Sequence, residues 1–303
     1  MIIYLRKQYI SVYMKVSGFT FVRNAVKYDY PVVASIKSIL PLCDEVIVSV
    51  GNCEDGTLEL IQSIGSPKIK IFHSVWDDSL KEGGRILAVE TDKAYAHVSA
   101  ESDWAFYIQA DEVVHEQDYD AIRTAMQQYR DDKRVEGLLF RYTHFFGSYD
   151  YIGDSRTWYQ NEIRIIRNDK RISSYRDAQG FRKEGQKLHV KPVNARMYHY
   201  GWVKDPKVQA QKVNNSFQMY HGSNETEVNG PVSADAFDYG EVDSLAVFKG
   251  THPGVMQERI HQKNWQFSHD ISRKKMSFKD TVLYWVEKIT GKRLFDYRNY
   301  KLI

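Results

Sequence analysis

Two adjacent carboxylates, Asp111 and Glu112, follow a short apolar segment of the sequence. Residues 104–108 (WAFYI) have the length and aromatic content of a buried strand, and Gln109 comes directly after them. Carboxylate oxygens at the end of a strand suit a hard divalent cation such as Mg²⁺ or Mn²⁺. The alternative interpretation is structural, because acidic residues also favour a helix start, and residues 116–128 have a helical pattern.

Apolar strand patterns alternate with helical patterns through the first third of the chain. The expected strands are residues 15–22, 44–50, 68–75 and 104–108, and the expected helices between them are residues 28–42, 55–64 and 83–100. Such alternation predicts right-handed crossovers and an α/β fold, with a mostly parallel sheet flanked by helices. In sheets of this kind, ligands bind beyond the carboxyl ends of the strands.

Each expected strand is followed by polar residues. They are, in chain order, Arg23 and Asn24, Asp55, Arg85 and Gln109. Because the ends of parallel strands meet at one edge, we expect these groups to converge on one crevice. Backbone N–H groups and Arg85 could bind a phosphate there. The alternative is that Asp55 belongs only to a turn and Arg85 only to a helix start.

Composition narrows the class of protein. The chain has 303 residues, 42 Lys and Arg against 39 Asp and Glu, a net charge of +3 and a pI near 8.5, well short of a nucleic-acid-binding profile. Cys43 and Cys53 lack metal-ligand or redox spacing, which indicates a reduced, cytoplasmic protein. No apolar run reaches about 18 residues, and the first residues lack a cleavable signal pattern.

The end of the chain is basic and amphipathic. Leu283, Trp285 and Val286 lie close in sequence to Lys288 and Lys292. Two interpretations remain open: packing against the rest of the protein, or peripheral contact with an anionic membrane at its inner face.

Residues 16–202 resemble the nucleotide-sugar-binding half of family-2-like glycosyltransferases of the GT-A fold. In that family the first strand ends in an Arg-Asn or similar pair, the second in an Asp-rich turn closing with Asp-Gly-Thr, and the fourth in an Asp-x-Asp motif. This chain has Arg23-Asn24, DGT at residues 55–57 and QADE at residues 109–112. It departs from the pattern at the first position of the last motif, where a neutral amide replaces an acid.

The resemblance implies a hexosyltransferase-type enzyme of polysaccharide biosynthesis. It would move a sugar from a nucleotide-diphosphate sugar to a carbohydrate or lipid-linked glycan, with inversion and with Mn²⁺ or Mg²⁺. The donor-binding residues implied are Arg23, Asn24, Asp55, Arg85, Gln109 and Asp111. Asp111 and His199 would bind the metal, although a histidine in an aromatic strand is also explained by packing. The resemblance places the catalytic domain at residues 1–203 and a mainly helical extension covering the crevice at residues 204–303.

An inverting transfer needs a carboxylate that takes the proton of the acceptor hydroxyl. The resemblance places this base between the acidic motif and the returning histidine, where the candidates are Asp154, Glu162, Asp169 and Asp177. We rank Asp177 first, because it lies in an expected loop, and Glu162 second. Glu112 is expected either to orient Asp111 or to contact the acceptor, and Trp158 in the aromatic segment is expected to contact the acceptor.

Two other function classes compete with this one. A nucleotidyltransferase of similar fold would need a Gly-rich loop bearing Lys or Arg after the first strand, and residues 22–31 (VRNAVKYDYP) contain no glycine. A non-catalytic nucleotide- or glycan-binding protein derived from the same fold is favoured by Gln109, which contributes no charge to a metal.

Overall fold

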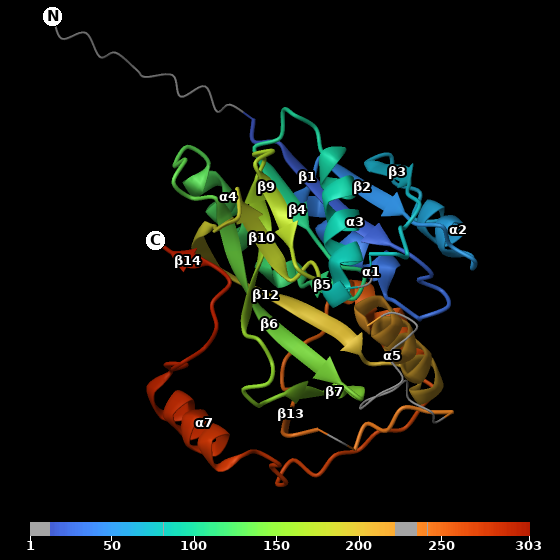
Figure 1. Cartoon of the computed structure of the whole chain (residues 1–303), viewed down its shortest axis with the longest axis vertical. Helices are drawn as coiled ribbons and strands as arrows, with labels where there is room; N and C mark the ends of the chain where they lie inside the picture. The colour runs from blue at the N-terminus through green and yellow to red at the C-terminus, as the bar shows by residue number, and fades with distance from the viewer. Residues whose placement is uncertain (1–12, 81, 222–234, 241) are drawn as a thin grey trace, which may run out of the picture.

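The computed structural model describes residues 13–80, 82–221, 235–240 and 242–303 (Figure 1). A large sheet runs through the molecule and carries helices on both of its faces. The helices are α1 (Val32–Ile39), α2 (Thr57–Gln62), α3 (Arg85–Ala96), α4 (Tyr119–Tyr129), α5 (Pro206–His221), α6 (Gln257–His261) and α7 (Phe278–Thr290).

Four parallel strands form the part of the sheet that the alternating pattern predicts. They are β1 (Val16–Val22), β2 (Glu45–Val50), β3 (Ile69–His73) and β4 (Trp104–Tyr107), in the spatial order β3-β2-β1-β4. After β3 the chain returns to the other side of β1, so the direction of winding reverses between β1 and β4. A sheet of this kind has its ligand crevice at that point. The predicted α/β fold, with a parallel sheet flanked by helices, is confirmed.

The second part of the sheet is mixed. β8 (Asn161–Arg167) runs antiparallel between β4 and β6 (Gly137–Phe146), and β7 (Ser148–Gly153) and β13 (Leu245–Val247) extend the sheet beyond β6. The long strand β12 (His189–Trp202) pairs with β6, β5 (Glu112–Val114) and β14 (Lys301–Leu302). A separate small sheet contains β9 (Ile172–Tyr175), β10 (Gly180–Lys183) and β11 (Gln186–Lys187).

Apolar side chains alternate between the two faces of the sheet, as the period of a strand requires. Val16 and Val22 of β1 join the core beneath α1 and α4, whereas Phe19 joins a second core beneath α3. Both cores are buried, so the strand ends between them are held in place. This fixes the positions of the polar groups that follow each strand.

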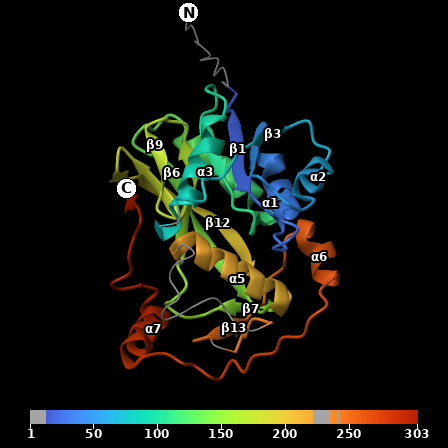
Figure 2. The same cartoon turned by 45° about the vertical axis from the view of Figure 1, so that its right-hand side comes forward.

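The chain after β12 extends over several sides of the molecule. Figure 2 shows α5 crossing in front of β12, with α6 and α7 on opposite sides of that view. None of the helices described is both long and apolar enough to cross a membrane.

Candidate functional site

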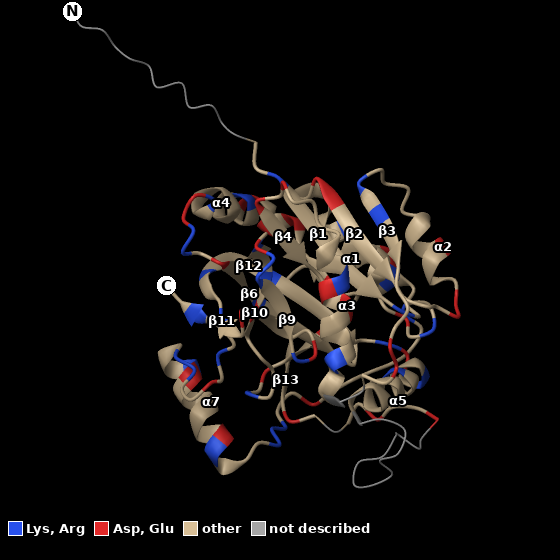
Figure 3. Ribbon diagram, turned by 45° about the horizontal axis from the view of Figure 1, so that its top comes forward, with Lys and Arg blue, Asp and Glu red and all other residues tan. Residues whose placement is uncertain are grey.

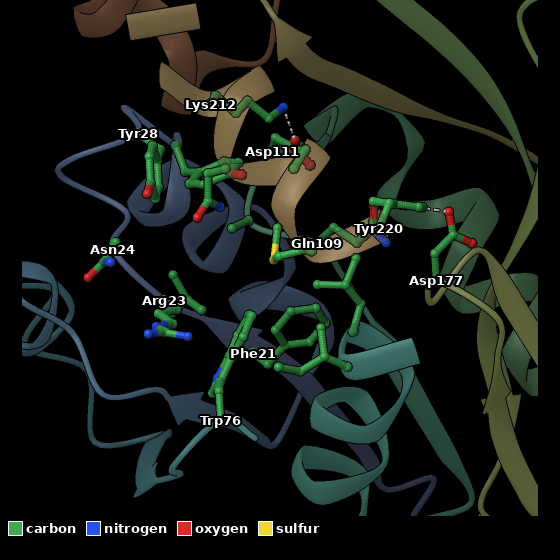
Figure 4. A pocket seen from close by; sticks show the side chains of 18 of the residues that line it. Phe21, Arg23, Asn24, Tyr28, Trp76, Gln109, Asp111, Asp177, Lys212 and Tyr220 are labelled. Atoms are coloured by element: carbon green, nitrogen blue, oxygen red, sulfur yellow. Dashed lines mark hydrogen bonds and ion pairs between the residues drawn. The ribbon is translucent and has the colours of Figure 1, made fainter. Parts of the chain in front are cut away.

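A pocket of about 490 Å³ opens at the carboxyl ends of β1 and β4. Phe21, Arg23 and Asn24 line it from the end of β1, Asp111 lines it from the segment after β4, and residues 212–220 of α5 supply the opposite wall (Figure 4). The pocket therefore lies where the winding of the sheet reverses, which is the expected ligand position.

One end of the pocket is built by Arg23 and Trp76. The Arg23 guanidinium lies 5.4 Å from the centre of the Trp76 ring and donates to Asp78 at 2.9 Å, while Phe21 packs against the same ring at 5.6 Å. A Cβ at Gly51 would lie 2.6 Å from Trp76 Nε1, so the ring requires a glycine in the turn after β2. Among the described residues, neither Arg23 Nε nor Trp76 Nε1 has a hydrogen-bond partner, although both atoms are buried. The ring faces of Phe21 and Trp76, beside the partly exposed Arg23 guanidinium, suit a planar polar ligand.

Asp55 connects two loops and does not line the pocket. Its carboxylate accepts hydrogen bonds from the backbone N–H of Lys27 at 2.6 Å and from the backbone N–H of Thr57 at 3.2 Å, and Thr57 in turn caps the loop after β1. Asn24 lies in the left-handed region, with φ of 54°, and accepts from the backbone N–H of Glu54 at 2.9 Å. Asp55 thus supports, from behind, the loops at the Arg23 end of the pocket.

Glu112 is fully buried and paired with Arg164. The Arg164 guanidinium donates to both carboxylate oxygens of Glu112, at 2.8 and 2.7 Å, and Tyr142 donates a third hydrogen bond at 2.7 Å. The backbone N–H of Gln109 also donates to Glu112, at 3.1 Å. Glu112 therefore has no exposed surface for an acceptor in this structure, and it holds the turn that carries Asp111.

Asp111 is buried at the pocket wall beside a lysine from α5. Lys212 Nζ lies 3.2 Å from Asp111 Oδ2 and donates to the Gly201 carbonyl at 2.8 Å. Burial alone would raise the pKa of Asp111, but Lys212 outweighs it and lowers that pKa below its usual range. Asp111 is therefore an ionised carboxylate that already faces one cation.

His199 is brought to Asp111 by the pairing of β12. In register His199 lies beside His144 of β6 and Glu112 of β5, and its Nε2 is 3.8 Å from Asp111 Oδ2. His144 Nε2 is 2.8 Å from the Tyr159 carbonyl, which can only accept, so this nitrogen carries the hydrogen. Burial, and then His199, lower the pKa of His144 to about 3, so His144 is neutral and its Nδ1 accepts from His199 Nδ1 at 3.2 Å.

This tautomer leaves the lone pair of neutral His199 at Nε2, on the side of Asp111. Burial lowers the pKa of His199, which favours the neutral ring. A Cβ at Gly201 would lie 2.7 Å from both His199 Nε2 and Asp111 Oδ2, so the glycine keeps the space beside both atoms free of a side chain. An imidazole nitrogen oriented by a second group, next to a carboxylate oxygen, fits a divalent cation.

The described residues contain no cluster of three or more His, Cys, Asp or Glu side chains that could hold a metal ion. A cation at Asp111 and His199 would therefore take its other ligands from water or from a bound phosphate group, which is common for Mg²⁺.

Asp177 lines the far end of the pocket. Tyr220 of α5 donates to Asp177 Oδ2 at 2.6 Å, and burial followed by Asp177 raises the pKa of Tyr220 well above its usual range. A Cβ at Gly84 would lie 2.9 Å from both side chains, so their close approach depends on this glycine, whose φ is 71°. Arg85, the next residue, is exposed and does not line the pocket.

Glu162 lies behind the pocket and is buried. Burial raises the pKa of Glu162 to about 8, against the opposing effect of Arg164. Its Oε2 has no hydrogen-bond partner among the described residues. A carboxyl group with this pKa is mostly protonated at neutral pH, and Glu162 does not line the pocket.

Trp158 lies outside the pocket, in a smaller cavity of about 200 Å³. Its ring packs 5.3 Å from His144 and 5.8 Å from Phe146. Tyr159 lines both cavities, so the two are neighbours.

The structure thus brings together five residues singled out in the sequence: Arg23, Asn24, Gln109, Asp111 and Asp177. His199 joins them from behind Asp111, whereas Asp55, Arg85, Glu112, Glu162 and Trp158 do not line the pocket. Sequence reasoning missed Trp76, Lys212 and Tyr220. Trp76 directly follows an expected strand, so the rule that ligands bind at strand ends, which identified Arg23, could also have found Trp76. Lys212 and Tyr220 belong to α5, and nothing in the local sequence of α5 indicates that this helix lies over the strand ends.

No family model and no curated protein matches this chain. Solved structures with some likeness include S. aureus TarS (TM-score 0.36, 14% identity, 70% of this chain and 41% of TarS). Glucosyl-3-phosphoglycerate synthase from Mycobacterium tuberculosis, solved with Mn²⁺ and uridine diphosphate, has a TM-score of 0.30 and 15% identity over 43% of each chain. A 4-diphosphocytidyl-2C-methyl-D-erythritol synthase from Anaerococcus prevotii has a TM-score of 0.31 and 9% identity over 51% of this chain and 70% of that one. Likeness at this level does not decide the function, which has to be argued from the pocket.

Proposed function

We propose that this protein is a glycosyltransferase that moves a sugar from a nucleoside diphosphate sugar to a hydroxyl group of a carbohydrate or lipid-linked glycan. One observation carries the proposal: a single pocket at the reversal point of the sheet joins the Arg23 guanidinium and the Trp76 ring to the Asp111–His199 pair. Such a pocket matches a ligand with a flat polar base at one end and negative charge near its middle. The resemblance of residues 16–202 to GT-A glycosyltransferases supports the same class.

The donor's nucleoside is assigned to the Arg23 and Trp76 end. The Arg23 side chain is 21% exposed, so its guanidinium can donate to a base or ribose. Phe21 and Trp76 offer apolar ring faces for stacking. Asn24 lies at the same end of the pocket, whereas Gln109 lies on the side of Tyr220, where its Nε2 donates to the Ala178 carbonyl at 3.4 Å (Figure 4).

The diphosphate is assigned to Asp111 and its surroundings. Asp111 Oδ2 and His199 Nε2 would hold a divalent cation, Mn²⁺ or Mg²⁺, which supplies Lewis-acid neutralisation of the departing diphosphate. Lys212 faces the same carboxylate oxygen and provides a second positive group at this place. Because Asp111 is ionised, it attracts both the divalent cation and the Lys212 ammonium, and these two compete for its carboxylate.

The base of an inverting transfer is assigned to Asp177. It would accept the proton of the acceptor hydroxyl while that oxygen bonds to the anomeric carbon and the bond to the diphosphate breaks. Asp177 and Tyr220 lie at the end of the pocket away from Arg23 and Trp76 (Figure 4). The sugar would lie at this end, because the diphosphate separates it from the nucleoside. Tyr220 holds the carboxylate in one orientation through its hydrogen bond.

Nucleotide binding tests the proposal directly. We expect uridine or guanosine diphosphate to raise the melting temperature, and to raise it further with Mn²⁺ than with a chelator. Trp76→Leu removes the ring face on which a base would stack, so the Kd should rise about fivefold or more, because stacking on one aromatic side chain contributes about 1–3 kcal/mol.

Trp158→Leu is the matched control. Trp158 lies outside the pocket, so removal of its ring should leave nucleotide affinity unchanged. Equal losses in the two variants, or no nucleotide binding by the wild-type protein, would contradict the assignment. Binding without transfer or donor hydrolysis would favour the non-catalytic alternative.

A further inference from the structure

The helix α7 has its polar side against the protein and its apolar side toward solvent. Four of its apolar residues, Phe278, Val282, Trp285 and Ile289, are exposed to 86%, 47%, 55% and 80%. Their spacing of four, three and four residues places them along one face of a helix. We call this set the α7 stripe. Surface helices ordinarily bury such a face, so its exposure requires an explanation.

The opposite face of α7 is held by ion pairs and hydrogen bonds. Tyr284 donates to Asp154 at 2.7 Å and Lys288 pairs with the same carboxylate at 2.7 Å. Glu287 pairs with Arg156 at 2.8 Å. These contacts fix the rotation of the helix about its axis, so the α7 stripe cannot turn inward without breaking them.

Positive charge accompanies the α7 stripe. Residues 273–298 contain eight Lys and Arg and three Asp and Glu, a net charge of +5, whereas the whole chain carries only +3. The rest of the protein is therefore slightly negative. Lys279 and Lys292 are exposed, one in the first turn of α7 and one just beyond its end. Figure 3 shows basic residues toward both ends of the helix.

We propose that α7 docks the protein on an anionic lipid membrane, with the α7 stripe inserted between headgroups. The charge decides between this occupant and a second copy of the chain, because stripe-to-stripe contact would bring two +5 segments together. A helix of 13 residues is about 20 Å long, so it lies along the surface and does not span the bilayer. Trp285, near the middle of the stripe, is the residue type that favours the headgroup region.

This proposal does not depend on the glycosyltransferase assignment, because α7 lines no part of the Asp111 pocket. Co-sedimentation of the full chain with lipid vesicles tests it. The protein should bind vesicles of phosphatidylcholine with phosphatidylglycerol and bind poorly to phosphatidylcholine alone. Each lysine near an anionic surface contributes about 1 kcal/mol, so Lys279→Gln with Lys292→Gln should weaken binding by about 30-fold.

Two matched variants separate the stripe from general surface effects. Phe278→Ser with Ile289→Ser should weaken vesicle binding about 10-fold or more, whereas Val75→Ser, which removes an apolar side chain 76% exposed elsewhere, should not. Lys37→Gln with Lys133→Gln removes the same charge from outside α7 and should also have little effect. Unchanged melting temperatures would show that the variants fold.

Fluorescence gives a second measurement. Brominated lipids should quench part of the tryptophan emission, and Trp285→Phe should abolish that part. The proposal is overturned if the wild-type protein does not bind anionic vesicles, or if the stripe variant binds them equally well. It is also overturned if light scattering shows a dimer that the stripe variant dissociates, because a second copy would then be the occupant.

Discussion

Glu162→Gln should make the protein more stable at mildly alkaline pH. Glu162 is buried beside Arg164 and Asn299, and its pKa is raised to about 8 mainly by burial. Glutamine has the shape of the protonated acid but cannot ionise. The substitution therefore preserves the form that the fold accommodates at neutral pH and removes the form that it does not.

The magnitude follows from the difference between the two pKa values. The folded-state pKa of Glu162 is about 8, and the ordinary value is 4.5. Between these values the folded state binds a proton that the unfolded state has released, so the free energy of unfolding falls as pH rises. Each unit of pKa difference corresponds to about 1.4 kcal/mol, which gives an upper limit of about 5 kcal/mol by pH 8.

Urea unfolding at a series of pH values from about 5 to about 8 measures this effect. The free energy of unfolding of Glu162→Gln minus that of the wild-type protein should rise by up to about 1.4 kcal/mol per pH unit. Using the difference cancels the titration of all other groups. Parallel pH profiles for the two proteins would refute the reasoning, because Glu162 would then ionise normally in the fold.

Glu45 provides a control of opposite sign. Burial opposes its ionisation, but hydrogen bonds from Lys70 and Ser17 outweigh burial and lower the pKa of Glu45. Its contribution to stability is therefore present at neutral pH and is lost as pH falls through the folded-state pKa. Glu45→Gln should destabilise the protein near neutral pH, and the difference from wild type should shrink in acid.

Three further substitutions test the assigned roles at the site. Asp177→Asn should retain nucleotide affinity but reduce turnover about 100-fold or more, and near-normal turnover would remove Asp177 as the base. Lys212→Met should tighten Mn²⁺ binding, because the ammonium no longer competes for Asp111, and should weaken metal-free binding of nucleoside diphosphate. Titration calorimetry measures both affinities. Weaker Mn²⁺ binding by the variant would exclude competition between Lys212 and the metal. Glu112→Gln should lower the free energy of unfolding by about 3–5 kcal/mol, because Arg164 would remain buried without its counter-ion, and a loss below about 1 kcal/mol in denaturant unfolding would contradict that role.

Local sequence patterns were sufficient for the parallel half of the fold. Each strand from β1 to β4 is a short apolar run, and each following helix has an apolar face, so neighbouring residues alone indicate the element. The rule that ligands bind at strand ends then identified Arg23, Asn24, Gln109 and Asp111 from the sequence alone, because that rule depends on chain direction and not on distant contacts.

Only the tertiary structure decided which carboxylates face the pocket. Glu112 directly follows Asp111 in sequence, yet the pleat of β5 directs it to Arg164 in the interior, whereas Asp111 faces α5. Glu162 and Asp177 are both acidic residues of the second half of the chain. Burial favours the protonated form of Glu162, whereas Asp177 lines the pocket. Burial depends on residues far apart in the chain, and no local pattern reports it.

Tertiary structure likewise decided the partners contributed by later elements. His199 reaches Asp111 only because β12 pairs with both β5 and β6, and Lys212 does so only because α5 crosses the strand ends. On α7 the sequence determined that one face is apolar, through spacing alone. The ion pairs of Asp154 and Arg156 with α7 determined that this face points to solvent, because such long-range contacts set the rotation of a helix and its local periodicity does not.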